Sequence, residues 1–306
     1  HVLPEDPRAM NKPIELKSVG GVRNDVSPER FKKGDLLAGV NVELDETGAV
    51  RRRGGVTNTL SAAAHSLWAS GQDAFVVLNG VLSRVMASLT TTAIRPVAGE
   101  HLAYSRIVDE VFWSDGVESG IINGNQSRQW GITVPPAFAA ASGPGSLREG
   151  EYLYTMTYAR ADGKESGAPI CGRLHSLGGI YFNALPVSSD PTVTTKNIYL
   201  SAWNGELPFL AATLPNSDNS AAITAPPPPG PQLRTQFMGP APAGQVVGHY
   251  KGRAYVASGR FLWYSAPFEF ELFDLMSGYL AFPSDVRTFA PVSDGIFVGS
   301  ENETVF

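Results

Sequence analysis

Cysteine is almost missing from this chain. Cys171 is the only one in 306 residues, and a single thiol cannot form a disulfide within the chain. This excludes the disulfide frameworks that hold many small secreted domains together, and it implies no oxidising compartment. A hydrophobic core must therefore provide most of the stability.

Charge is scarce as well. Only 17% of the residues are charged, and the formal net charge is −5. Proteins that grip nucleic acid usually present a strongly basic face, so this composition disfavours tight DNA binding. A DNA-contacting role remains an alternative only if the DNA has to pass the protein without being bound tightly.

Long apolar runs and strong helix signals are also lacking. The chain has no run of about 18 apolar residues and no signal-peptide pattern, so we expect no membrane span. One segment has a helix-start signal, with Ser27 as a possible N-cap before Pro28. It predicts a single turn or a short helix that ends before Gly34.

Turn-forming residues, by contrast, are abundant. The chain has 32 glycines, 23 prolines and 43% apolar residues, whereas glycine and proline together make up about 12% of average proteins. This composition supports a large core crossed by many turns. It predicts a mainly β fold made of short strands.

Four segments share a pattern of strand, turn and strand. The centres of their apolar cores are Val76, Phe112, Tyr255 and Phe297. The spacings are 36, 143 and 42 residues, and the first and last suit the repeat of about 40 residues in a β-propeller. The middle spacing equals one repeat plus about 100 residues, the size of an inserted domain. We therefore expect a propeller-like body of short antiparallel blades with one insertion.

Linkers of distinctive composition delimit the insertion. An Ala/Gly/Ser/Pro stretch at 135–145 precedes it, and the proline-rich "APPPPGPQ" at 225–232 follows it. Between them, Asp162-Gly163 and Asn204-Gly205 are hairpin signals, which favour an immunoglobulin- or fibronectin-like β-sandwich. The predicted organisation is an N-terminal arm at 1–18, a first part of the body at 19–136, the insertion at 137–232 and a second part of the body at 233–306.

No catalytic or metal-binding motif stands out. The five histidines are scattered, and the nucleophile elbow, Walker A and paired metal-ligand spacings are missing. We therefore predict no catalytic, cofactor or metal residue. Acidic side chains leave one alternative open, a glycosidase on a propeller, which would need two carboxylates to converge. The candidate acids are Asp109, Glu110, Asp115, Glu118, Glu269, Glu271 and Asp274.

Several aromatic residues could stack on sugars or bases. Their period-two placement in expected strands favours a place in the core and in contacts between blades. These residues are Trp113, Trp130, Trp203, Trp263 and Tyr264.

The most unusual stretch is "NVELDETGAVRRRGG" at 41–55. Arg51, Arg52 and Arg53 could bind phosphate or nucleic acid, or they could belong to a strand that an assembly needs. A phosphate site favours neighbours of the same sign, but the preceding residues are acidic. The acidic neighbours favour the second interpretation.

Alternation in this stretch predicts a hairpin. Val42 and Leu44 would lie on one face of the first strand, and Glu43 and Asp45 on the other. "DETG" turns the chain, so the acids and arginines would face each other across the two strands. One arginine must then point away from its two neighbours, toward another subunit or a carboxylate beneath the hairpin.

The same region resembles a known family. The motifs are "GGVRNDVSPERFKKGDLLAGVNVELDETGAVRRRGG", "YSRIVDEVFWSDGVESGII", "RQWGITVPP", "GEYLYTMTYARADGKESGAP" and "GRAYVASGRFLWYSAPFEFELFD". They are similar to parts of the tail-nozzle (tail tubular) and packaged-DNA-stabilisation proteins of podovirus-type bacteriophages. The resemblance covers most of residues 19–306. The positions that match the family motif, carried over as structural or interface candidates, are Arg23, Asn24, Asp25, Arg51, Arg52 and Arg53.

The resemblance implies a structural virion protein without catalytic residues. In this family, copies (typically six) form a ring around the DNA exit channel, next to the portal, the adaptor and other tail proteins. The implied role is to retain the packaged genome and to conduct double-stranded DNA, bound without sequence specificity, during ejection. The protein would be assembled in the bacterial cytoplasm and located in the virion tail.

Two functions remain as alternatives, a carbohydrate-active depolymerase and a module that adheres to the host envelope. The segments so far do not obviously close a propeller, and the chain stops within an expected hairpin. We therefore expect the native protein to continue beyond Phe306.

Overall fold

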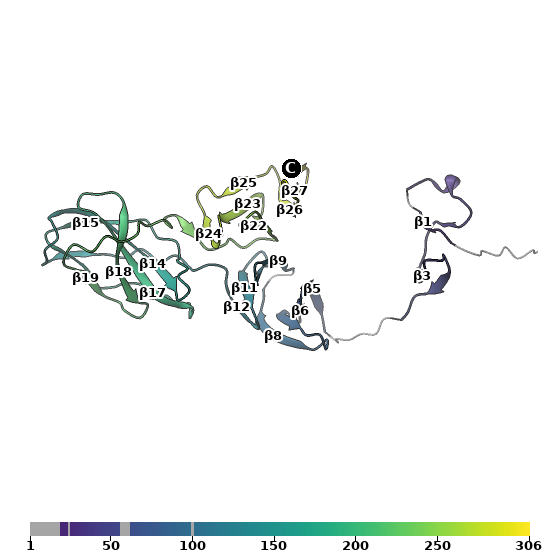
Figure 1. Cartoon of the computed structure of the whole chain (residues 1–306), viewed down its shortest axis with the longest axis horizontal. Coiled ribbons are helices and arrows are strands. Elements are labelled where there is room, and N and C mark those ends of the chain that lie inside the picture. The colour runs from purple at the N-terminus through teal and green to yellow at the C-terminus, as the bar shows by residue number, and fades with distance from the viewer. Residues whose placement is uncertain (1–18, 24, 56–61, 99–100) are drawn as a thin grey trace, which may run out of the picture. The chain divides into compact units, whose positions relative to one another are not determined.

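The computed structural model describes residues 19–23, 25–55, 62–98 and 101–306 (Figure 1). The protein is mainly β, with 51% of the described residues in strands arranged in several antiparallel sheets, which confirms the predicted class. The described residues contain no α-helix. The short turn expected before Gly34 is present as the 3-10 helix η1 (Pro28–Arg30). Ser27 precedes it, but its side chain makes no capping hydrogen bond.

The chain divides into two compact units, His1–Ser61 and Ala62–Phe306. The predicted organisation has no domain boundary between residues 61 and 62. The predicted N-terminal arm at 1–18 lies outside the described residues.

The first unit consists of two small pairs of strands. Strand β1 (Gly21–Val22) runs parallel to β2 (Asp35–Leu36), and β3 (Val42–Leu44) forms an antiparallel hairpin with β4 (Val50–Arg52). Among its described residues only Val19 is buried. The described part of this unit therefore has almost no hydrophobic core of its own.

Four sheets of the second unit are built mainly from antiparallel strands that follow one another along the chain. The first contains β5 (Ala64–Ser70), β6 (Asp73–Leu78), β7 (Val81–Val85) and β8 (Thr91–Pro96). The second contains β9 (Ala103–Ile107), β10 (Glu110–Ser114), β11 (Ser119–Asn123) and β12 (Gln126–Gln129). The third contains β20 (Met238–Gly239), β21 (Val246–Tyr250), β22 (Arg253–Ser258), β23 (Phe261–Ala266), β24 (Glu269–Asp274) and β25 (Tyr279–Ala281). In this third sheet β20 pairs with β24, and β25 pairs with β23. The fourth contains β26 (Val286–Pro291), β27 (Ile296–Ser300) and β28 (Thr304–Val305).

The four repeat centres predicted from the sequence occupy equivalent places. Val76 lies in β6, Phe112 in β10, Tyr255 in β22 and Phe297 in β27. In each of the four sheets this strand pairs with the strands directly before and after it along the chain. The predicted pattern of strand, turn and strand is therefore confirmed in all four segments.

Successive sheets pack against each other through alternate residues of the same strands. In β10, Val111 and Trp113 join a cluster with Phe75 of the first sheet. Phe112, which points to the opposite face, joins a cluster with Val256 of the third sheet. Side chains of the third and fourth sheets share a further cluster. The sheets thus form a series in which the second and third are covered on both faces.

In each sheet the first strand of the consecutive run (β5, β9, β21 or β26) also lies next to that of the following sheet. Strand β5 neighbours β9, β9 neighbours β21, and β21 neighbours β26. Gly248 of β21 allows the close approach, because a Cβ atom there would collide with the ring of Phe289 in β26. The four sheets are therefore arranged side by side around these strands.

The segment between β12 and β20 forms two further antiparallel sheets, which lie together in Figure 1. One contains β13 (Ala141–Gly143), β16 (Gly179–Phe182) and β19 (Ala221–Ile223). The other contains β14 (Gly150–Arg160), β15 (Gly172–Ser176), β17 (Val193–Ser201) and β18 (Pro208–Pro215). The predicted Asn204-Gly205 hairpin connects β17 to β18, with Asn204 at φ +50°.

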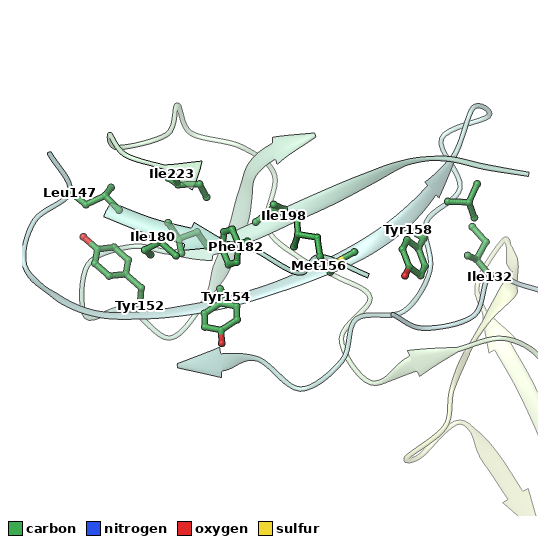
Figure 2. Close-up of a cluster of buried hydrophobic side chains, with 13 residues drawn as sticks. Ile132, Leu147, Tyr152, Tyr154, Met156, Tyr158, Ile180, Phe182, Ile198 and Ile223 are labelled. Carbon is green, nitrogen blue, oxygen red and sulfur yellow. The ribbon is translucent and has the colours of Figure 1, made fainter. Parts of the chain in front are cut away.

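A single hydrophobic cluster joins these two sheets (Figure 2). Tyr154 and Met156 of β14 meet Ile180 and Phe182 of β16, and the rings of Tyr154 and Phe182 are 5.6 Å apart. Cores of this kind supply most of the free energy of folding. This cluster fixes the two sheets of the segment between β12 and β20 to each other.

The aromatic residues predicted for the core divide into two groups. Trp113 and Trp130 are fully buried, whereas Trp203 is 40% exposed. Trp263 and Tyr264 are half-buried, and the ring of Trp263 packs against Tyr279. The prediction of a place in the core is therefore confirmed for Trp113 and Trp130, whereas Trp203 is exposed.

Candidate functional site: the arginine hairpin and a buried ion-pair network

The arginine stretch forms the predicted hairpin. Val42 pairs with Arg52, Glu43 with Arg51, and Leu44 with Val50. Arg51 Nε lies 3.4 Å from a carboxylate oxygen of Glu43. The expected acid-to-arginine pairing across the strands is therefore present for Glu43 and Arg51.

Asp45 fixes the turn of this hairpin. Its Oδ1 accepts hydrogen bonds from the backbone N–H groups of Thr47 and Ala49, at 2.9 and 3.0 Å, and from the Thr47 hydroxyl at 2.6 Å. These bonds, first of all the one from the Thr47 hydroxyl, lower the pKa of Asp45. The acid therefore sets turn geometry, and it forms no ion pair with an arginine among the described residues.

The three arginines lie on different faces. Residues that pair directly across two antiparallel strands point to the same side, so Arg52 shares a face with Val42, Leu44 and Val50. Arg51 lies on the opposite face with Glu43. Arg52 is thus the arginine that the sequence required to point away, and it points to the apolar side.

The other motif positions belong to the pair of strands that precedes the hairpin. Arg23 binds Asp25 with two nitrogens, at 3.1 and 3.0 Å, and approaches Asp35 at 3.4 Å. The hydrogen bond to Asp25 raises the pKa of Arg23 and lowers that of Asp25. Asn24 lies outside the described residues. Arg23 and Asp25 therefore stabilise a local turn, and their role at an interface stays a prediction.

A second cluster of charged residues, which the sequence analysis did not assemble, surrounds Glu271 of β24. Arg128 of β12 donates two hydrogen bonds to this carboxylate, at 2.5 and 2.8 Å. Arg160, at the end of β14, and Lys164, in the following turn, each donate one more, at 2.5 and 2.6 Å. Arg128 also binds Glu110 of β10 at 3.1 Å. This ion-pair network joins the second sheet, the third sheet and the segment between β12 and β20.

The network is buried, and its charges decide the protonation of Glu271. Its side chain is only 8% exposed, and that of Arg160 only 5%. Burial raises the pKa of Glu271, but the hydrogen bonds and charges of Arg128, Lys164 and Arg160 outweigh it and bring the pKa down to about 2. Glu271 is therefore a permanent anion at neutral pH and balances the surrounding cations.

This pKa predicts an acid-sensitive contribution to stability. The folded value of about 2 lies below the ordinary value of 4.5, so the contribution is complete above pH 4.5 and is lost as the pH falls toward 2. The shift corresponds to about 3 kcal/mol. We expect the difference in unfolding free energy between wild type and Glu271→Gln, measured with urea, to be large at pH 7 and to lose most of this amount by pH 2.5. A difference that does not change with pH would contradict the ionic role of Glu271.

The other candidate acids take up separate structural positions. Asp115 accepts hydrogen bonds from the backbone N–H groups of Val117 and Glu118, and Asp274 does the same for the turn that follows β24. Glu118 pairs with Arg95 at 2.6 Å. Asp109 lies in an exposed turn. Only Glu110 and Glu271 of the predicted acids are brought together, through Arg128.

A cavity of about 970 Å³ lies beside the network. Its lining includes Arg128, Tyr158 and the loop 187–192, together with neutral polar side chains of β11 and β12. At one side, Arg160 Nη2 and Asp190 Oδ2 are buried 3.6 Å apart, and neither has a hydrogen-bond partner in the described part of the chain. The Arg128 and Arg160 guanidinium groups already bind Glu271, so the cavity shows no cluster of free charges.

Local sequence signals could not have found this network. Arg128 and Glu271 are 143 residues apart, and Arg160 and Glu271 are 111 apart. One hint was available, because Glu271 stands two residues before the fully buried Phe273 in an expected strand and therefore shares its face. That alternation indicates a buried acid without naming its partners.

Comparisons with known proteins do not assign the chain to a family. No protein-family model matches it, and no curated protein matches it either. Within the described residues, no group of three or more His, Cys, Asp or Glu side chains is placed to hold a metal ion. No helix in the described part of the chain is long and apolar enough to span a membrane.

Proposed function

We propose that this protein is a structural component of a bacteriophage tail. Copies of it form a ring around the DNA exit channel, retain the packaged genome and conduct it during ejection. In this proposal the four serial sheets belong to a β-propeller-like body, and the segment between β12 and β20 is an inserted immunoglobulin- or fibronectin-like sandwich.

The arrangement of the four serial sheets is the observation that carries the proposal. Each sheet contains a run of consecutive antiparallel strands, its faces pack on its neighbours, and the strands that begin these runs (β5, β9, β21 and β26) lie side by side. Propeller blades are organised in this way, with the innermost strand of each blade facing a central axis. Joined to the motif resemblance, this arrangement favours a tail-nozzle protein.

The ion-pair network favours a structural role for the insertion, which these ion pairs hold on the body. A general acid in glycoside hydrolysis needs a raised pKa so that it can carry a proton at neutral pH. Glu271 and Glu110 both bind Arg128, but cations surround Glu271 and its pKa is about 2. The ion pairs of Glu271 therefore support a structural contact between the insertion and the body more than the alternative of a depolymerase active site.

The charge distribution suits a DNA conduit. Residues 1–61 contain 10 basic and 9 acidic residues, which leaves 14 basic and 20 acidic residues in 62–306. An acidic wall repels the phosphate backbone and lets DNA pass without being retained. In this proposal the larger unit forms the wall of the channel.

Labelling of phage particles tests the proposal. Antibodies raised against this protein should decorate the tail of purified virions that contain it, at the end of the DNA channel. A protein found only in the lysate and never in the particle would overturn the proposal. Cleavage of capsule or lipopolysaccharide by the purified protein would favour the depolymerase instead.

A further inference from the structure

A second cavity, of about 480 Å³, lies entirely within the segment between β12 and β20. Its volume is in the range of roughly 300–1,000 Å³ that is usual for ligand sites. Three stretches of chain form its walls, 147–152, 200–210 and 226–230, and most of the side chains that line it are apolar. Two of them, Trp203 and Phe209, are 40% and 37% exposed. Exposed aromatic rings around a cavity of this size indicate a binding site, which we call the tryptophan pocket.

The ring of Trp203 is held in one orientation. Its indole N–H donates to the carbonyl oxygen of Glu149 at 2.7 Å. The edge of the ring packs on Gly150, where a Cβ atom would collide with the indole nitrogen. The guanidinium carbon of Arg148 lies over the face of the ring, 3.4 Å from its centre. A side chain that is already fixed loses little conformational freedom when a ligand binds, so this exposed ring is pre-organised.

The opposite wall, the proline run Pro226–Pro229, is fixed as well. Before the run, the N–H of Ser146 donates to the carbonyl oxygen of Thr224 at 2.6 Å. After the run, the N–H of Leu210 donates to the carbonyl oxygen of Pro231 at 2.9 Å. Consecutive prolines are stiff in themselves. The tryptophan pocket therefore has rigid walls on both sides.

Arg148 supplies the charge of the tryptophan pocket. It is the only charged side chain among the described residues that line the pocket. It is exposed, and its neighbour Glu149 lies beside His175 instead. The described residues contain no hydrogen-bond or ion-pair partner for the Arg148 guanidinium group, whose planar N–H donors suit a carboxylate. A matching ligand should therefore carry a carboxylate.

The other polar side chains of the pocket are already used. The hydroxyl of Ser201 donates to the carbonyl oxygen of Ala202, and that of Tyr152 donates to the carbonyl oxygen of Arg148. A sugar would bury several hydroxyl groups here without partners, which is unfavourable. Proline has an apolar ring and no backbone N–H that needs an acceptor. A proline-rich peptide therefore matches this lining better than a sugar does.

We propose that the tryptophan pocket binds a proline-rich segment of a partner protein in the polyproline II conformation. Proline rings of the segment pack on Trp203 and Phe209, and an acidic residue of the segment pairs with Arg148. Segments of this kind bind grooves lined by aromatic residues because their conformation is fixed before binding. The proline run of a second copy is a poor match, since residues 225–232 contain no acid.

Titration with synthetic peptides tests the proposal on the whole chain. The probe is a fluorescently labelled peptide of Pro-Pro-Glu repeats, which places its acids along one edge because polyproline II has about three residues per turn. Peptides of Pro-Pro-Lys and Gly-Ser-Glu repeats control for charge and for conformation. Measured by fluorescence anisotropy, the probe should bind at least about tenfold more tightly than either control. No binding, or equal affinity for the probe and for Pro-Pro-Lys repeats, would overturn the proposal.

Charge reversal at Arg148 tests the ion pair. Arg148→Glu should weaken binding of the Pro-Pro-Glu peptide at least about tenfold and strengthen binding of the Pro-Pro-Lys peptide. A variant that fails to fold could not produce this reversed preference. Arg260→Glu is the matched control, because Arg260 is also exposed and lies over an aromatic ring, that of Phe261, away from the pocket. Arg260→Glu should leave both affinities unchanged, and equal effects of the two variants would contradict the assignment of Arg148.

Removal of the ring tests the pocket itself. Trp203→Ala should abolish binding of the Pro-Pro-Glu peptide while circular dichroism shows that the fold is kept, and full affinity in this variant would overturn the proposal. Polygalacturonate is the competing probe. If it bound in a Trp203-dependent way and the peptide did not, the ligand would be an acidic glycan and the proposal would be wrong. The inference goes beyond the proposed function and is independent of it, since peptide binding and labelling of the virion can each fail alone.

Discussion

Replacing Glu271 by glutamine is expected to lower the free energy of unfolding by about 3–5 kcal/mol. The substitution keeps the size of the side chain but removes the anion that Arg128, Arg160 and Lys164 share. Three cations, two of them largely buried, would then be left without most of their compensation. Urea denaturation at pH 7 measures the change directly.

Glu269 offers a matched control for this experiment. It belongs to the same strand, β24, but it is exposed. Glu269→Gln should change the free energy of unfolding by less than about 0.5 kcal/mol. Equal effects of the two substitutions would show that the network around Glu271 does not lock the insertion to the body.

Replacing Trp130 by alanine is expected to cost about 3–5 kcal/mol. Trp130 directly follows the second sheet and is fully buried, with its ring 4.9 Å from Phe112 and 5.8 Å from Phe273 of the third sheet. Its indole N–H donates to the carbonyl oxygen of Phe270 at 2.7 Å. Alanine would open a cavity where the second and third sheets meet, and thermal or urea unfolding would report the loss.

Two further variants serve as comparisons for Trp130→Ala, one that separates packing from hydrogen bonding and one at an exposed tryptophan. Trp130→Phe keeps most of the ring but leaves the Phe270 carbonyl oxygen without its donor, so we expect a loss of about 1–3 kcal/mol. Trp203→Ala, at a position that is 40% exposed, should cost less than Trp130→Ala. A small effect of Trp130→Ala would contradict the serial packing of the sheets.

The parts of the structure that the sequence predicted depend on neighbours along the chain. The β3–β4 hairpin could be derived because alternation, the "DETG" turn and the order of charges act within a few residues. The four repeat centres were found for the same reason, because each lies within a local run of strand, turn and strand. The sequence required only that one arginine point away from its two neighbours, and the pairing register in the structure identifies it as Arg52.

The parts that the sequence did not predict depend on distant segments. Tyr154 and Met156 lie on one buried face of β14, but Thr155 and Thr157 on the other face are also buried. Their hydroxyl groups donate to Pro169 and Glu165, in a segment that folds back over the strand. Contacts of this kind, like those of Glu271, follow from the tertiary fold and leave no local pattern.

Electron cryo-microscopy of the purified protein, and of virions that contain it, tests the central claim most directly. The account predicts a ring of copies around a channel wide enough for double-stranded DNA. A uniform population of single copies, with no matching density in the tail, would contradict it.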